Sequence, residues 1–188
     1  MKKHPSLWIS AAVLALVVFS LNSCDKLEEA DDISFDADFT VTFNVNEQAE
    51  ETNKHYFDIE VLDARSNSKV NDYASKIKSI KINKITYLIT NYSADPPGTD
   101  VMFSGGTLGF SAITSIAPTV VADNVAEDLQ ATTTETELDM DAAQLNEIAT
   151  ELLKTLSVNV FTDGTLSSSP VAFKVPVKFY VTITANAL

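Results

Sequence analysis

The chain has 188 residues, 45% of them hydrophobic, and its 26 acidic side chains outnumber 13 basic ones, for a formal net charge of −13. This acidity argues against nucleic-acid binding, which needs a basic surface, and against a domain that lies flat on anionic lipid. The chain has a single cysteine, so an intramolecular disulfide is excluded. The length suits one domain with a core of its own.

The first residues have the pattern of a secretory signal. Lys2 and Lys3 form a short basic segment, and residues 7–21 form an apolar run. A permanent transmembrane helix is the alternative, but it needs about 20 apolar residues to cross the hydrocarbon core, and this run is shorter. We therefore expect residues 1–23 to be a signal peptide that is removed. Its removal leaves 11 basic against 26 acidic side chains, a balance of −15.

The apolar run ends in Leu21, Asn22, Ser23 and Cys24, which resembles the lipobox of bacterial lipoproteins. The resemblance implies that diacylglycerol is attached to Cys24 through a thioether, that the chain is cleaved before Cys24, and that the new N-terminus is acylated. Two or more acyl chains anchor a protein stably, whereas one chain holds it only marginally. A free thiol is the alternative for this residue. We interpret Cys24 as a lipidation site and the lipid bilayer as a partner.

An acidic segment without aromatic residues follows Cys24, and we expect residues 24–33 to form a flexible tether. A solvated charge run is the simplest interpretation. Acidic residues directly after a lipidated cysteine also resemble the surface-export signal of lipoproteins in Bacteroidota. That resemblance implies a protein anchored in the outer membrane and exposed at the cell surface. In an enterobacterial host, Asp25 beside the cysteine would imply retention in the inner membrane instead.

Residues 34–188 are expected to form a single domain, in which alternation of apolar and polar residues predicts β-strands with one buried face. The alternation is longest over residues 35–45 and 171–183, where the odd positions are apolar. Pro176 interrupts the second of these segments. Because proline cannot donate a hydrogen bond to a neighbouring strand, we expect an edge strand or a bulge at this position.

Weaker strand signals fill the middle of the chain, over residues 56–62, 80–90, 101–110, 132–138 and 158–161. The apolar parity changes within 80–90, which a bulge near Asn83 and Lys84 would explain; burial of both faces is the alternative. Asp163 and Gly164 follow the last of these segments, and this dipeptide predicts a hairpin turn.

Two helices are expected. The stronger spans 142–155 and has a stripe of apolar residues at helical spacing; Asp141 can cap it, with Gln144 as the capping-box partner. The weaker spans 70–77. Many strands and one packing helix predict a mainly β protein, an antiparallel β-sandwich of immunoglobulin-like or fibronectin-like type, with the helix over an open end or edge. A closed barrel is the alternative.

The sequence has few residues suited to catalysis. His55 is the only histidine outside the predicted signal, and no nucleophile elbow, phosphate-binding loop or zinc motif is present. We therefore predict no enzymatic activity and no cofactor besides the covalent lipid on Cys24. A calcium ion, which takes oxygen ligands, is a minor alternative. The residues considered for calcium are Asp123, Asn124, Glu127, Asp128, Asp139 and Asp141, and the tyrosines considered as exposed glycan-stacking rings are Tyr56, Tyr87, Tyr92 and Tyr180.

We weigh three functions. The first is a membrane-anchored, non-catalytic accessory of the cell envelope with a structural or binding role and a protein or glycan partner. The second is a carrier of a lipid or another apolar molecule, which needs an internal cavity. The third is a hydrolase of glycans, which needs two carboxylates in a cleft. The leucine-rich helix followed by Val158, Asn159 and Val160 and a closing strand pair is also similar to the desiccation-related LEA type 2 sandwich, which implies a non-enzymatic stress or binding domain.

Overall fold

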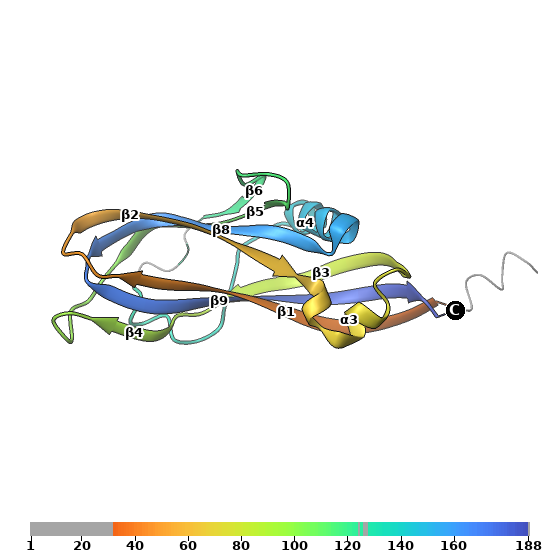
Figure 1. Cartoon of the computed structure of the whole chain (residues 1–188), viewed down its shortest axis with the longest axis horizontal. Helices are drawn as coiled ribbons and strands as arrows, with labels where there is room; N and C mark the ends of the chain where they lie inside the picture. The colour runs from red at the N-terminus through yellow and green to blue at the C-terminus, as the bar shows by residue number, and fades with distance from the viewer. Residues whose placement is uncertain (1–31, 124, 126–127, 188) are drawn as a thin grey trace, which may run out of the picture.

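The computed structural model describes residues 32–123, 125 and 128–187. The predicted signal, Cys24 and most of the predicted tether lie outside these residues. Two antiparallel sheets pack face to face, so the predicted β-sandwich is confirmed (Figure 1). The strands are β1 (Asp32–Glu47), β2 (Thr52–Asp63), β3 (Ile77–Tyr87), β4 (Thr90–Ala94), β5 (Phe103–Ala112), β6 (Val120–Ala122), β7 (Thr136–Glu137), β8 (Ser157–Ser168) and β9 (Val171–Asn186).

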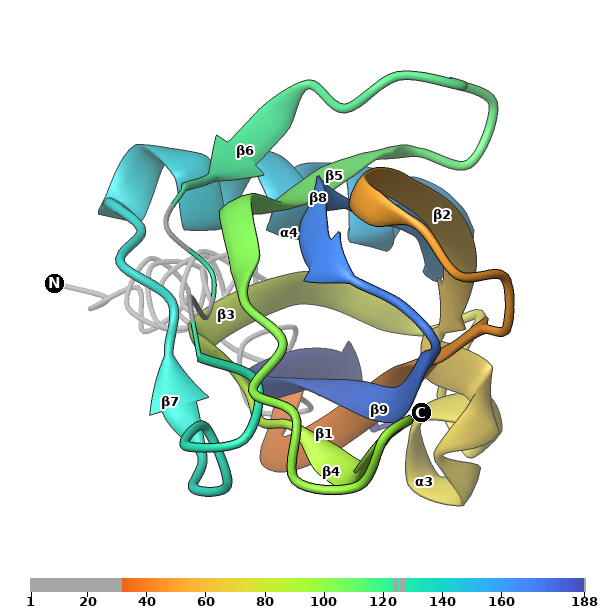
Figure 2. The same ribbon diagram turned by 90° about the vertical axis from the view of Figure 1, so that its left-hand side faces the viewer.

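Sheet A contains β1, β9, β3 and β7 in that order, with β4 also paired to β9, and sheet B contains β2, β8, β5 and β6. Consecutive strands β1 and β2 therefore belong to different sheets, and so do β8 and β9. Seen end-on, the two sheets form the two layers of the sandwich (Figure 2). Strands β1 and β2 are edge strands of their respective sheets on the same side of the sandwich.

The long strands β1 and β9 pair over their whole length, from Asp32 opposite Asn186 to Glu47 opposite Val171. Their buried apolar residues are the odd-numbered ones, as the alternation predicts. The two sheets meet through these side chains. The ring of Phe179 in β9 lies edge-on to that of Phe110 in β5, with centroids 5.7 Å apart, a geometry that aromatic pairs favour.

Pro176 does not mark a sheet edge, because β9 lies between β1 and β3. The expectation of an edge strand is therefore wrong. On the side of β3 and β4, however, the neighbouring strand is interrupted: β3 ends at Tyr87 and β4 begins at Thr90. The carbonyl of Pro176 accepts a hydrogen bond from the N–H of Leu88 in this interruption (N···O 3.4 Å). A missing N–H is tolerated here because no regular ladder needs it.

The predicted bulge in β3 is confirmed, since the register against β9 shifts between Ile82 and Lys84. The predicted turn at Asp163 and Gly164 is wrong: β8 continues through both residues to Ser168. Gly164 serves packing instead, because a Cβ built on it would lie 2.3 Å from the Phe103 ring. The segment predicted over 132–138 forms only the two-residue strand β7.

Helix α4 (Ala142–Thr155) matches its predicted bounds, and its capping box between Asp141 and Gln144 is present. It buries Ile148 and Leu152 and contacts β3 of sheet A together with β8 and β5 of sheet B, so it covers an open edge of the sandwich. The weaker predicted helix is short: after the 3-10 turn η1 (Ala64–Ser66), α3 (Ser68–Asp72) ends early. No helix in the described part of the chain is long and apolar enough to cross a membrane.

Candidate functional site: the outer face of sheet B

The predicted calcium ligands serve local roles where the structure describes them. Asp141 accepts a hydrogen bond from the N–H of Gln144 (2.8 Å) as the cap of α4. Asp128 accepts from the N–H groups of Gln130 (2.9 Å) and Ala131 (3.0 Å) in a turn. Asp123 and Asp139 are exposed, and Asn124 and Glu127 lie outside the described residues. Among residues 32–123, 125 and 128–187, no three acidic, histidine or cysteine side chains form a group that could hold a metal ion.

The four candidate tyrosines do not form an aromatic platform. Tyr56 and Tyr87 are buried in the core. Tyr92 is half-buried, and its hydroxyl donates to the carbonyl of Thr99. Tyr180 lies on the outer face of sheet A. The burial of Tyr56, helped by the nearby negative charge of Asp58, raises the pKa of its phenol well above the usual range, so this group stays neutral.

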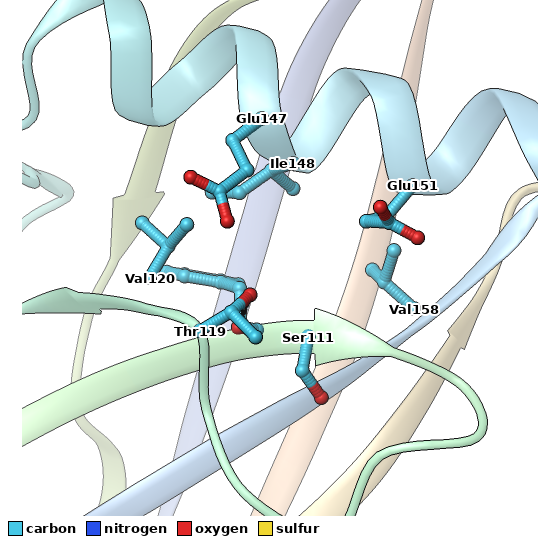
Figure 3. Close-up of a pocket in the computed structure, with 8 residues that line it drawn as sticks. Ser111, Thr119, Val120, Glu147, Ile148, Glu151 and Val158 are labelled. Carbon is cyan, nitrogen blue, oxygen red and sulfur yellow. Dashed lines mark hydrogen bonds between the residues drawn. The ribbon is translucent and has the colours of Figure 1, made fainter.

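Two glutamates lie one turn apart on α4 and resemble the carboxylate pair that a glycan hydrolase needs. Figure 3 shows Glu147 and Glu151 on the side of the helix that faces β5, with Ser111 pointing away from them. The hollow between them and the sheet has a free volume of about 0 Å³. Glu151 also pairs with Lys154 (2.6 Å). This hollow has no room for a sugar ring or for an attacking water.

The space between the two sheets is almost filled. An opening between the sheets beside Val45, Phe103 and Phe173 holds about 10 Å³, roughly the space of one water molecule. Larger hollows are open grooves at the surface. One of about 480 Å³ lies between α4 and β3, and one of about 460 Å³ lies at the β8–β9 turn beside Glu50, Glu51 and Asp95. An apolar ligand therefore finds no enclosed site in these places.

The most distinctive surface feature is an apolar row on β2, which we call the β2 row: Phe57, Ile59 and Val61. Their side chains are 47%, 37% and 51% exposed. They point outward because the alternate residues Tyr56 and Leu62 of the same strand are in the core. Isolated exposed apolar residues are common, but a contiguous row on one strand is typical of a contact surface.

Part of this outer face is covered by the chain itself. The loop between β5 and β6 arches over sheet B (Figure 2). Asn159 of β8, only 7% exposed, holds this loop: its side-chain amide donates to the carbonyls of Ala112 (3.3 Å), Ile113 (3.3 Å) and Ser115 (2.7 Å). Pro118 of the loop lies so close to β5 that a Cβ on Gly109 would be 2.5 Å from the Pro118 Cβ.

This cover buries Phe161, which points outward from β8 yet is 1% exposed. Its ring lies 6.2 Å from that of Phe57, so the β2 row continues directly into covered apolar surface. Register places Phe161 opposite Ile59 and Asn159 opposite Val61. On this face the open apolar residues of β2 therefore adjoin one covered apolar ring, that of Phe161, while their other neighbours on β8 include the polar residues Asn159 and Asp163.

In β2 the apolar residues of the β2 row face outward and the acidic residues between them face the other way, the reverse of an ordinary strand with one buried face. Asp58 and Glu60 alternate with the β2 row, so their side chains lie on the side of the strand that carries Tyr56 and Leu62, where both are half-buried. Asp58 accepts from the Tyr56 hydroxyl (3.1 Å). Glu60 has no hydrogen bond or ion pair with any residue that the structure describes. Residues 56–62 belong to a strand as predicted, but the more apolar odd positions, which alternation alone assigns to the core, face outward, so the sequence does not reveal this site.

No family model matches the sequence, and no curated protein matches it. Solved structures overlap with it only distantly. A BFDV capsid protein in a 60-mer assembly has a TM-score of 0.44 at 9% identity, over 84% of this chain and 97% of that chain. A structure of Desmodium yellow mottle tymovirus has a TM-score of 0.42 at 9% identity, over 84% and 89%. No conclusion about this chain follows from similarities of this size.

Proposed function

We propose that the protein is a cell-envelope lipoprotein, anchored to a membrane through Cys24, that acts as a non-catalytic binding accessory. The observation that carries the proposal is the lipobox-like segment Leu21 to Cys24, which directly follows an export signal and precedes a folded domain by a few residues. The acidic residues after Cys24 support an outer-membrane, surface-exposed location of the Bacteroidota type.

The length of the connection limits how far the domain can lie from the bilayer. Strand β1 begins at Asp32, eight residues after Cys24, and an extended chain spans at most about 3.3–3.6 Å per residue, or roughly 25–30 Å here. Asp32 pairs with Asn186, so the tether would leave from the end of the sandwich that also carries the C-terminal end of β9 (Figure 1). The edge strand β2 begins at the opposite end of the sandwich and runs back toward that end (Figure 1).

A binding role agrees with the surfaces described above. The β2 row offers an open apolar contact, and the chain has a strongly acidic charge that keeps the rest of the domain solvated. The two alternatives gain no support from the geometry: the space between the sheets is too small for a lipid, and the paired glutamates of α4 enclose no cleft.

The anchor is tested by Cys24→Ala. The substitution should release the protein from membranes into the soluble fraction and abolish metabolic labelling with palmitate, because the thioether can no longer form. Ser20→Ala is the matched control, since it changes the same signal and keeps Cys24; it should leave both readouts as in the wild type. Membrane association and labelling that survive Cys24→Ala would refute the proposal.

A further inference from the structure

We propose that the free edge of β2 is a docking edge for an extended segment of a partner protein in which apolar residues alternate with lysine or arginine. The inference deepens the binding role proposed above by naming the chemistry of the partner. It rests on three properties of β2: an open backbone edge, the apolar row on one side of the strand, and carboxylates on the other.

The backbone edge is open along the strand. β2 has twelve residues, and among the strands that the structure describes it pairs only with β8. The N–H of Ile59 donates to the carboxylate of Asp58 in its own strand (2.8 Å), which fits a backbone group that faces the edge and has no neighbouring strand. An unpaired edge of this length is a template for an added strand. A cation that pairs with Asp58 would free this N–H for the backbone of the partner.

The two sides of the strand determine what the partner must carry. Side chains alternate along an added strand as they do along β2, so one set lies beside Phe57, Ile59 and Val61 and the other beside Asp58 and Glu60. The first set is therefore apolar and the second basic. Glu60, which has no ionic partner within the described residues, offers an unpaired negative charge on this side.

A second copy of the chain fits this edge poorly. In an antiparallel pair of β2 strands centred on Ile59, Asp58 of each copy would lie opposite Glu60 of the other, and like charges directly opposite are destabilising. The negative charge of the whole chain adds to this repulsion. The other long edge strand, β1, lacks an apolar row: its outward residues include Ser34, Asp36, Asp38 and Thr40. The chemistry thus favours β2 and a basic partner.

The test uses the full chain as the cell processes it, in detergent, and fluorescein-labelled octapeptides whose ends are blocked. The first peptide alternates lysine and valine; the second alternates glutamate and valine; the third is the first with one central valine replaced by proline. Fluorescence anisotropy should show binding of the lysine peptide that weakens with added salt, and affinities at least about tenfold lower for the other two. The acidic peptide meets like charge, and the proline peptide loses a backbone donor.

Variants locate the site. Glu60→Lys should weaken binding of the lysine peptide about tenfold, because it replaces an attraction with a repulsion. Val61→Thr, which keeps the shape of the side chain, should weaken it about threefold. Asp36→Lys is the matched control, an acidic residue of the other edge strand, and should leave the affinity within twofold. Circular dichroism and thermal unfolding verify that each variant is folded.

Several results would overturn the proposal: no binding of the lysine peptide at millimolar concentration, equal binding of the proline or glutamate peptide, or equal losses in Asp36→Lys and Glu60→Lys. A dimer of the unmodified chain that Glu60→Lys strengthens or Val61→Thr dissociates would assign the edge to a second copy instead. Because the assay does not depend on lipid at Cys24, its failure would leave the anchor proposal standing, and failure of the Cys24 experiment would leave this result standing.

Discussion

The outer faces of the two sheets differ in the chemistry of their outward-facing residues. On sheet A the outward residues are polar and pair with one another. Lys178 lies 3.1 Å from Asp38 across the β1–β9 pair, the Thr182 hydroxyl donates to Asp36 (2.7 Å), and the Tyr180 hydroxyl donates to Glu135 (2.6 Å). On sheet B the outward residues include the apolar β2 row and Phe161 of β8, and the β5–β6 loop covers Phe161.

The difference shows that the packing of the core does not determine whether the outer face of a sheet is polar or apolar. Both sheets contribute to one continuous core. The outer face of sheet A is polar and is well solvated, whereas sheet B leaves the apolar β2 row exposed. The chain covers the centre of sheet B and leaves its edge uncovered. We infer that the uncovered edge is the part available for a partner, and the comparison can be tested by changing each face separately.

The largest effect is expected from Asn159→Ala, which removes the amide that holds the β5–β6 loop over sheet B. The carbonyls of Ile113 and Ser115 lose this donor, whereas that of Ala112 keeps the backbone N–H of Ser115 (2.9 Å), and buried polar groups that lose a partner are costly. The free energy of unfolding, measured in urea, should fall by about 2–3 kcal/mol. Binding of the dye ANS should rise, because Phe161 becomes accessible.

Asn44→Ala is the control for that experiment, since it makes the same substitution on the outer face of sheet A. The Asn44 side chain is exposed and donates only to the carbonyl of Thr42 (3.3 Å). Its removal should change the free energy of unfolding by less than about 0.5 kcal/mol. If both substitutions have similar effects, the loop is not an energetically important cover for sheet B.

The interior of both sheets was easier to predict than the outer face of sheet B. The buried faces of β1 and β9 and the bounds of α4 follow from local patterns: strict alternation in the strands, and a capping box at Asp141 before a helical stripe. Such patterns are local, so they can be read from the sequence. The bulge between Ile82 and Lys84 was also visible as a change of parity.

The errors arose where a distant contact overrides a local preference. Gly164 is in a strand because the ring of Phe103 occupies the space of a Cβ, and Pro176 is tolerated in a central strand because its neighbour is interrupted there. The orientation of β2 depends on which of its two faces meets the other sheet. Alternation separates the residues of the two faces but does not say which face is inside, so the β2 row could be recognised only from the packed structure.

A smaller effect is expected from Val61→Thr, which changes the open part of sheet B. Because this side chain is half-exposed, the free energy of unfolding should change by less than about 0.5 kcal/mol. Val41→Thr on the buried face of β1 is the matched substitution, and it should cost about 1–3 kcal/mol, since it places a hydroxyl in the core. Urea unfolding of both variants measures the difference. Equal losses would mean that Val61 is buried in solution and that the β2 row is not open.

The smallest effect is a pH dependence on sheet A. The carboxylate of Glu135 accepts hydrogen bonds from the hydroxyls of Thr86 (2.6 Å) and Tyr180 (2.6 Å), and these bonds, first that of Thr86, hold the pKa of Glu135 below its usual value of 4.5. A carboxylate whose pKa is lower in the folded state stabilises the fold above its unfolded pKa. That contribution is lost as the pH falls through the folded pKa.

Tyr180→Phe removes one of the two hydroxyls, so the pKa of Glu135 should rise toward its usual value. The variant should therefore be less stable than the wild type at pH 7, and the gap should close as the pH falls below 4.5 and the carboxylate is protonated. Tyr92→Phe is the control, because the Tyr92 hydroxyl donates to a backbone carbonyl and its loss should have the same effect at every pH. Urea unfolding at several pH values distinguishes the two. A difference in the free energy of unfolding between Tyr180→Phe and the wild type that stays constant with pH would show that Tyr180 does not stabilise the charge of Glu135. The outer face of sheet A would then be stabilised by the packing of its side chains on the strands beneath them.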